Sequence, residues 1–164
     1  MLKAIFIFIT LIHGAIHLMG FAKAFNLAEI KELTCVISKP AGLLWLLCTI
    51  IFIITAALFY AGYKHWWIIA TAGVLISQAL IFSCFKDAGF GTIPNIIILS
   101  SAIEAYGVYS FNNYSQAWLN TILNSASAEK IKVSEQSVKT LPPSLKKWFE
   151  RSNVIEKDIS ASYF

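Results

Sequence analysis

The sequence predicts an all-α integral membrane protein, in which four spanning helices form a bundle and an amphipathic helical tail follows. Of the 164 residues, 57% are hydrophobic and only 13% are charged, whereas soluble domains average about 25% charged residues. The apolar residues gather in blocks of roughly 20 residues, the length that crosses a bilayer. A chain this short has too little interior to bury so much apolar surface in a soluble core.

The expected spans lie at about Ala4–Phe25, Ala41–Tyr63, Trp66–Phe85 and Ile93–Phe111. They are expected to be helical because the backbone in a bilayer must satisfy its own hydrogen bonds. Pro40 and Pro94 suit the first turns of the second and fourth spans. The short connection Lys64–His65 requires the second and third spans to form an antiparallel hairpin.

The connections carry weaker signals. NLAEIKELTCVI (26–37) has apolar Leu27, Ile30 and Leu33 on one helical face, which predicts a short amphipathic helix on the membrane surface. KDAGFGT (86–92) predicts a tight glycine turn. Cys35, Cys48 and Cys84 form no CxxC pair, so we expect them to act as small hydrophobic residues, without a disulfide framework.

We divide the chain into a four-span transmembrane domain (1–112) and a second region (113–164). In the second region, YSQAWLNTIL predicts an interfacial helix, SASAE a linker and LPPSLKKWFERSNV a short helix. DISASYF alternates polar and apolar residues and predicts a β-strand. This strand is expected to open a soluble domain that continues beyond it.

The polar residues inside the spans are the candidate site. His13 and His17 stand four apart and therefore share a helical face. Gln78 and Glu104 fall at the same depth, near the bilayer centre. A carboxylate there costs a few kcal/mol, so we expect Glu104 to face His13 inside the bundle, within direct or one-water hydrogen-bonding reach.

Two interpretations of this intramembrane polar site stay open. Its residues can be interhelical hydrogen-bond partners, worth roughly 0.6 kcal/mol each, or a functional site such as a proton relay or a ligand pocket. A metal is not favoured, because the HxxxH pattern lacks the glutamate of zinc proteases, and one helix turn cannot supply both axial ligands of a haem. We therefore assign no cofactor, no metal and no catalytic residues, and an enzyme is less favoured than a binding or anchoring protein.

Small residues predict where helices approach one another closely. Gly14 and Gly20 lie on the first span, and Gly73 and Ser77 form a small-xxx-small pair on the third. We expect the first span to pack against the third or fourth at these positions.

HGAIHLMGFAKAF, SKPAGLLWLL, SQALIF and KDAGFGTIPN together resemble a family of bacterial four-span membrane proteins of unknown activity. That family opens with an HGxIHLxGF-type motif and has a soluble domain after its spans. The resemblance implies a multi-pass protein of the bacterial inner membrane. It brings no catalytic role for His13, His17, Gly14 or Gly20.

The leading function is a membrane anchor or sensor module with a small polar intramembrane pocket. The alternatives are a small proton-coupled transporter and an accessory subunit of a larger membrane complex. The expected partners are the lipid bilayer and a membrane protein or a second copy. Nucleic acid is not expected, because the lysines flank apolar blocks rather than interleave with aromatic residues. The lysines of the loops nearly balance across the membrane and lean slightly to an external N-terminus.

Overall fold

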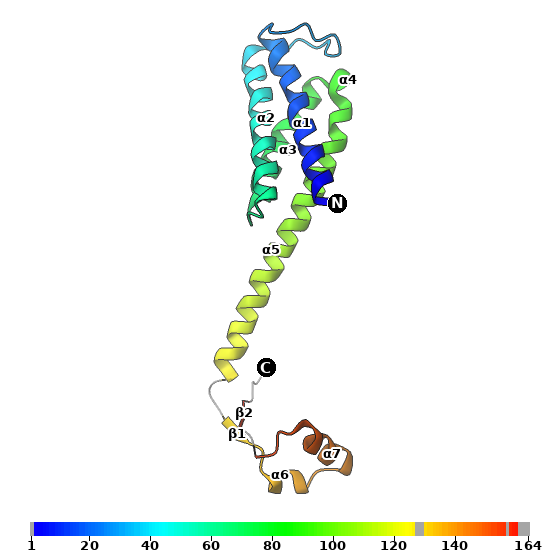
Figure 1. Ribbon diagram of the computed structural model, residues 1–164. Coiled ribbons are helices and arrows are strands. Elements are labelled where there is room, and N and C mark those ends of the chain that lie inside the picture. The colour runs from blue at the N-terminus through cyan, green and yellow to red at the C-terminus, as the bar shows by residue number, and fades with distance from the viewer. Residues whose placement is uncertain (1, 127–129, 157, 161–164) are drawn as a thin grey trace. The chain divides into compact units, whose positions relative to one another are not determined.

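The computed structural model describes residues 2–126, 130–156 and 158–160. Within them, four helical segments are long and apolar enough to cross a membrane, and their helices pack together as a bundle (Figure 1). They comprise α1 (Leu2–Ala24), α2 (Lys39–Tyr60), α3 (Trp66–Ser83) and α5 (Thr92–Ala126), the last preceded by the short α4 (Phe85–Ala88) and η1 (Gly89–Gly91). The predicted all-α, four-span architecture is confirmed.

The chain divides into two compact units, Met1–Tyr109 and Ser110–Phe164. We call the first the membrane unit and the second the tail unit, and we describe each by itself. The helix α5 begins in the membrane unit and runs without a break past this division.

The helix ends follow local sequence signals. Ser38 caps α2 by accepting a hydrogen bond from the Ala41 amide, and Pro40 lies at the start of that helix. The helix α1 ends before Asn26, which has a positive φ of 55°, a conformation that asparagine tolerates better than most residues. Gly62 has a φ of +69° in the connection from α2 to α3, where a side chain would be strained.

An aromatic cluster fills the end of the membrane unit at which α1 begins. The ring of Phe6 lies 4.5 Å from that of Phe59 and 5.4 Å from that of Trp66, and the Phe59 and Trp66 rings are 4.9 Å apart. Phe52 and Cys48 of α2 are completely buried nearer the middle. Cys48 is therefore the small hydrophobic residue that the sequence predicts.

The glycines of α1 lie against α2, and the expected contact with the third or fourth span is wrong for them. A Cβ on Gly14 would meet Phe52, and one on Gly20 would overlap the indole of Trp45. A Cβ on Gly73 would meet Ile51, so α2 is the helix approached closely from both sides. Ser77 is buried, but it forms hydrogen bonds rather than only allowing close packing.

The connection between α1 and α2 corrects two predictions. It forms no helix over 26–37, and Cys35 is joined to Cys84 by a disulfide with the Cα atoms 5.7 Å apart. The amides of Thr34 and Cys35 both donate to the Asp87 carboxylate. These contacts occupy backbone groups that a helix would pair internally, and Leu33 is buried within the membrane unit.

The segment 86–92 also differs from the prediction. It is helical, as the end of α4 followed by the 3-10 turn η1, and Gly89 has a helical φ of −54°. The tight glycine turn is therefore wrong, and Gly91 lets this segment lie close to Ile81. A Cβ on Gly91 would meet Ile81 and the His13 ring.

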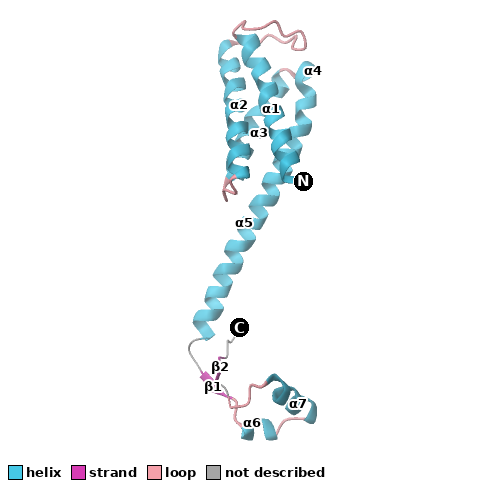
Figure 2. Ribbon diagram, viewed as in Figure 1, coloured by secondary structure: helices cyan, strands magenta, loops and turns pink. Residues whose placement is uncertain are grey.

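In the tail unit, the predicted helices form, and so does the predicted strand. The helix α5 covers the whole of YSQAWLNTIL, and LPPSLKKWFERSNV contains α7 (Pro143–Ser152). The strand β2 (Asp158–Ser160) pairs antiparallel with β1 (Lys130–Lys132), and α6 (Glu135–Lys139) lies between them in sequence (Figure 2). The remainder of DISASYF lies outside the described residues.

We expect Gly20→Ala to destabilise the membrane unit by about 1–3 kcal/mol, because its methyl group would force α1 away from Trp45. Gly107→Ala is the matched control, since no atom lies within 4 Å of a Cβ built there. It should be neutral or stabilising by up to about 1 kcal/mol, because alanine is the better helix former. Thermal unfolding in detergent would measure both, and equal effects of the two changes would contradict this packing.

Candidate functional site

The two histidines of α1 point into the membrane unit. Their exposed fractions are 2% for His13 and 1% for His17, and their ring centroids lie 4.8 Å apart. The four-residue spacing places both on the same inner face. Phe52 of α2 contacts both rings, with centroid distances of 4.9 Å to His13 and 5.7 Å to His17.

The histidines bind two polar side chains from other helices. The Nε2 of His13 is 2.8 Å from the Asn95 Oδ1 on α5 and 3.3 Å from the Ser77 Oγ on α3. The Nε2 of His17 is 2.9 Å from the same Ser77 Oγ. An amide oxygen only accepts hydrogen bonds, so the Nε2 of His13 donates, and its Nδ1 carries a lone pair.

Asn95 is the centre of this network. Its Nδ2 donates to the Ser77 Oγ and to the Gln78 Oε1, both at 3.0 Å. The Nε2 of Gln78 in turn donates to the Thr92 Oγ1 at 3.1 Å. Asn95 is only 2% exposed. It links α1, α3 and α5 because it both donates and accepts hydrogen bonds.

The structure brings together three of the four predicted site residues and separates the fourth. His13, His17 and Gln78 share the network, whereas Glu104 is exposed on α5. The expected pair of His13 with Glu104 is wrong. Glu104 lies nine residues after Asn95, about two and a half helical turns, and therefore on the opposite face of α5.

Asn95 and Ser77 are the site residues that the sequence analysis missed or assigned to packing alone. A signal for Asn95 is present in the sequence. Asn95, Ile98 and Ala102 follow the spacing of one helical face, and all three are buried. An amide inside an apolar block, on the same helical face as Ile98 and Ala102, indicates the inner face of that helix.

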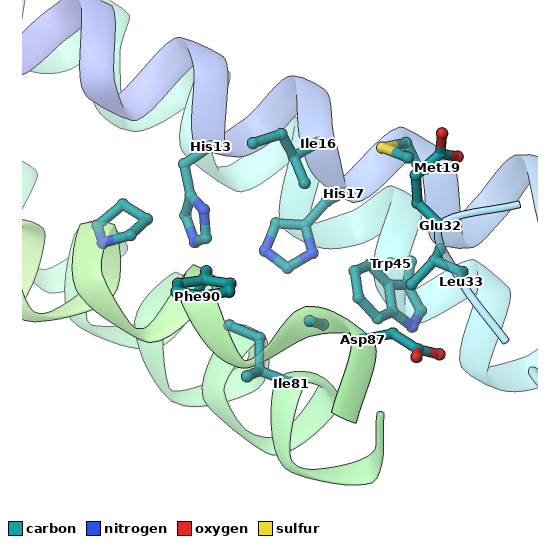
Figure 3. A pocket seen from close by; sticks show the side chains of 13 residues that line it. His13, Ile16, His17, Met19, Glu32, Leu33, Trp45, Ile81, Asp87 and Phe90 are labelled. Carbon is teal, nitrogen blue, oxygen red and sulfur yellow. The ribbon is translucent and has the colours of Figure 1, made fainter. Parts of the chain in front are cut away.

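A cavity of about 260 Å³ lies beside the histidines (Figure 3). His13 and His17 stand side by side along it, opposite Phe90 and Ile81, with Trp45 from α2 further along. Its lining residues come from six elements and the first connection, and comprise His13, Ile16, His17, Met19, Glu32, Leu33, Trp45, Ile81, Asp87, Ala88, Phe90, Gly91 and Pro94. Most of this lining is apolar.

Three buried nitrogen atoms of the cavity residues have no hydrogen-bond partner within the described part of the chain. They are the Nδ1 atoms of His13 and His17 and the Nε1 of Trp45. Buried polar groups are usually paired, and leaving one unpaired costs about 1–3 kcal/mol. All three atoms are covered by neighbouring side chains, so a ligand or water pairs with them only when those side chains move.

The first connection covers the cavity at the end where α1 terminates. Glu32 and Leu33 line the cavity, and the disulfide from Cys35 follows two residues later. Asp87 also lines it and accepts hydrogen bonds from the Thr34 and Cys35 backbone, the latter at 2.8 Å. Lys23 donates to the Leu33 carbonyl oxygen. The first connection, which we call the cover, is thus held in place by the disulfide and by hydrogen bonds with Asp87 and Lys23.

The described residues contain no group of three histidine, cysteine or acidic side chains arranged to hold a metal ion. Comparison with protein families, with curated proteins and with solved structures found no match to this chain. The resemblance drawn from the HGAIHLMGF motif therefore stays a prediction. The chain is a multi-span membrane protein with a buried histidine, serine and asparagine network.

Asn95→Leu should destabilise the membrane unit by about 1–3 kcal/mol, because the His13 Nε2 and the Gln78 Oε1 lose their shared partner. Asn113→Leu is the control: the same substitution on the same helix at an exposed position. It should change stability by less than about 0.5 kcal/mol. Unfolding of both variants in mixed micelles would measure the difference, and an undisturbed Asn95→Leu protein would show that the network has no structural weight.

Proposed function

We propose that this chain is a membrane sensor or anchor module, whose membrane unit binds a small ligand in the cavity beside His13 and His17. The observation that carries the proposal is the position of α5. This helix contributes Pro94 to the cavity and Asn95 to the network, and it continues unbroken to Ala126. An occupant that alters the network therefore acts on the helix that leads into the tail unit.

The proton-coupled transporter is the second candidate, and the packing favours it less. A transport path must reach both membrane surfaces. The polar network lies on the cavity side of the bundle, whereas Phe6, Phe59 and Trp66 pack closely at the end where α1 begins. Glu104, the carboxylate that such a relay would use, is exposed on α5. A cavity closed at one end fits ligand binding.

The disulfide supports an orientation opposite to the one that the lysines favour. Cys35 and Cys84 lie in connections at the same end of the bundle. Disulfides persist in oxidising compartments and are rare in the cytosol. The cavity cover then faces the outside, and the N-terminus lies in the cytoplasm. We propose that the module lies in the inner membrane of a bacterium, with the covered end of the cavity toward the periplasm.

Reporter fusions test this orientation. A fluorescent protein fused after residue 64 should fluoresce, because that connection is cytoplasmic, and alkaline phosphatase fused after residue 30 should be active, because it is exported. The reverse pattern would contradict the orientation.

Counting the free thiols is the control for the orientation, because it tests whether the disulfide on which the orientation rests has formed. A maleimide polymer added to the denatured, unreduced protein should label Cys48 alone, and all three cysteines after reduction.

The cavity is tested with toluene as a probe on the full chain in lipid nanodiscs. Cavities of about 150 Å³ bind benzene, so toluene should bind and slow hydrogen exchange at the start of α5. Ala88→Phe should abolish this protection by filling the cavity. Ala117→Phe, on the exposed face of α5, should leave it intact. Equal protection in both variants, or none in the original protein, would refute the ligand site.

A further inference from the structure

The position of the cavity in the membrane also defines the class of ligand, and this step rests on the proposed ligand site. We propose that the cavity opens sideways into the bilayer and binds the end of a hydrocarbon chain, the chemistry of a lipid acyl tail. Three features lead to this class: the depth of the opening, the apolar lining behind it and the positions of the charged residues.

The level of the cavity in the membrane follows from α1. His13 is the middle residue of this helix, which runs from Leu2 to Ala24, so it lies near the centre of the bilayer. A Cβ built on Gly91 would lie 3.5 Å from the His13 Cε1, which places η1 at the same level. Ile16 is three residues further along α1, about 4.5 Å at the helical rise. This end of the cavity therefore lies within the hydrocarbon layer, which is about 30 Å thick.

Two residues that line the cavity at this level are also exposed on the surface of the membrane unit. Ile16 of α1 is 49% exposed, and Phe90 of η1 is 86% exposed. Figure 3 shows Phe90 across the cavity from Ile16 and His13. Side chains that both line a cavity and reach the surface mark its rim. The cavity therefore opens between α1 and η1, toward lipid rather than water.

A cavity that opens into hydrocarbon is best filled by hydrocarbon. Apolar cavities exclude water, and empty space costs the lining atoms their dispersion contacts. Most of the lining is apolar, and the unpaired nitrogen atoms of His13, His17 and Trp45 are covered by neighbouring side chains. An entering chain therefore meets mainly carbon. The volume of about 260 Å³ is sufficient for several methylene groups, since about 150 Å³ holds benzene.

The lining extends in one direction, which favours a chain over a compact ligand. His13, His17 and Trp45 follow one another along the cavity (Figure 3), and successive ring centroids are 4.8 Å and 4.9 Å apart. A flexible chain can follow this wall from the rim at Phe90 toward Trp45.

The charged residues lie at the other end, below the cover. Glu32 and Asp87 line the cavity beside Trp45 (Figure 3), and Asp87 is occupied by the Thr34 and Cys35 amides. Among the described residues that line the cavity there is no lysine or arginine. An anionic headgroup would meet two like charges and no cation inside. Only the uncharged end of a lipid enters, and its headgroup stays at the membrane surface.

The test uses a phosphatidylcholine with a photoreactive diazirine near the methyl end of one acyl chain, mixed into nanodiscs that hold the full chain. Irradiation yields a carbene that inserts into the residues it contacts, and peptide mass spectrometry locates the adducts. We expect adducts at Trp45 and Ile81, which are 3% and 1% exposed and lie beyond the reach of lipid that stays outside. Ile68, 47% exposed on α3, is the reference for ordinary lipid contact. A lipid with the diazirine beside its headgroup should label neither Trp45 nor Ile81.

Two controls connect the adducts with the cavity. Ala88→Phe should lower the yield at Trp45 and Ile81, relative to Ile68, roughly tenfold or more, because the added ring fills the space. Ala79→Phe is the same change on the exposed face of α3, and it should leave the ratio unchanged. Saturating toluene on the unmodified sequence should reduce the same adducts by competition, which needs no substitution.

The outcomes distinguish this inference from the function on which it rests. Adducts confined to exposed residues such as Ile68, with toluene still protecting α5, would overturn the chain while the ligand site stands. Adducts at Trp45 that persist in Ala88→Phe or with toluene would place the chain outside the cavity. Equal labelling of Trp45 by both lipids would contradict entry at the bilayer centre. Absence of both the adducts and the toluene protection would remove the ligand site itself.

Discussion

The buried amide of Asn95 is the interaction on which the membrane unit depends. Polar groups in a bilayer have no water to pair with, so each must find a protein partner. Asn95 supplies donors and an acceptor at once, to Ser77 and Gln78 on α3 and to His13 on α1. One side chain on α5 thereby joins three helices, whose apolar surfaces alone would allow many similar packings.

The second constraint is the fixed cover at the end where α1 terminates. The disulfide joins the first connection to the end of α3, and Asp87 pairs with the backbone of the same connection. A connection held this way cannot follow its local helical preference, but it buries Leu33 and covers the cavity. The network and the cover thus both contribute residues that line the cavity, His13 and His17 from the first and Leu33 and Asp87 from the second.

The sequence predicts what is periodic and misses what is long-range. Block length predicts the four spans, and the four-residue spacing predicts the shared face of His13 and His17. Depth in the bilayer gives the position of Glu104 along the helix axis, but it does not say which face of the helix Glu104 occupies. Depth alone therefore cannot decide whether Glu104 meets His13. The Cys35–Cys84 disulfide joins residues 49 positions apart in the sequence, and no local sequence pattern predicts it. The spacing of Asn95 with Ile98 and Ala102 is a signal for its inward position, but depth near the bilayer centre, the criterion that selects Gln78 and Glu104, does not select Asn95 at the start of its span.

The arrangement of satisfied and unsatisfied atoms distinguishes the two interpretations of the histidines. If the histidines served only to join helices, one hydrogen-bonded nitrogen on each ring would be enough. An apolar atom in place of each Nδ1 would then pack without the cost of an unpaired polar group. The Nε2 atoms do bind α3 and α5, and this is the structural role. The Nδ1 atoms lack partners within the described residues, on side chains that line a cavity. Since an unpaired buried atom costs about 1–3 kcal/mol, a ligand whose entry moves these side chains and pairs with either Nδ1 atom gains that free energy.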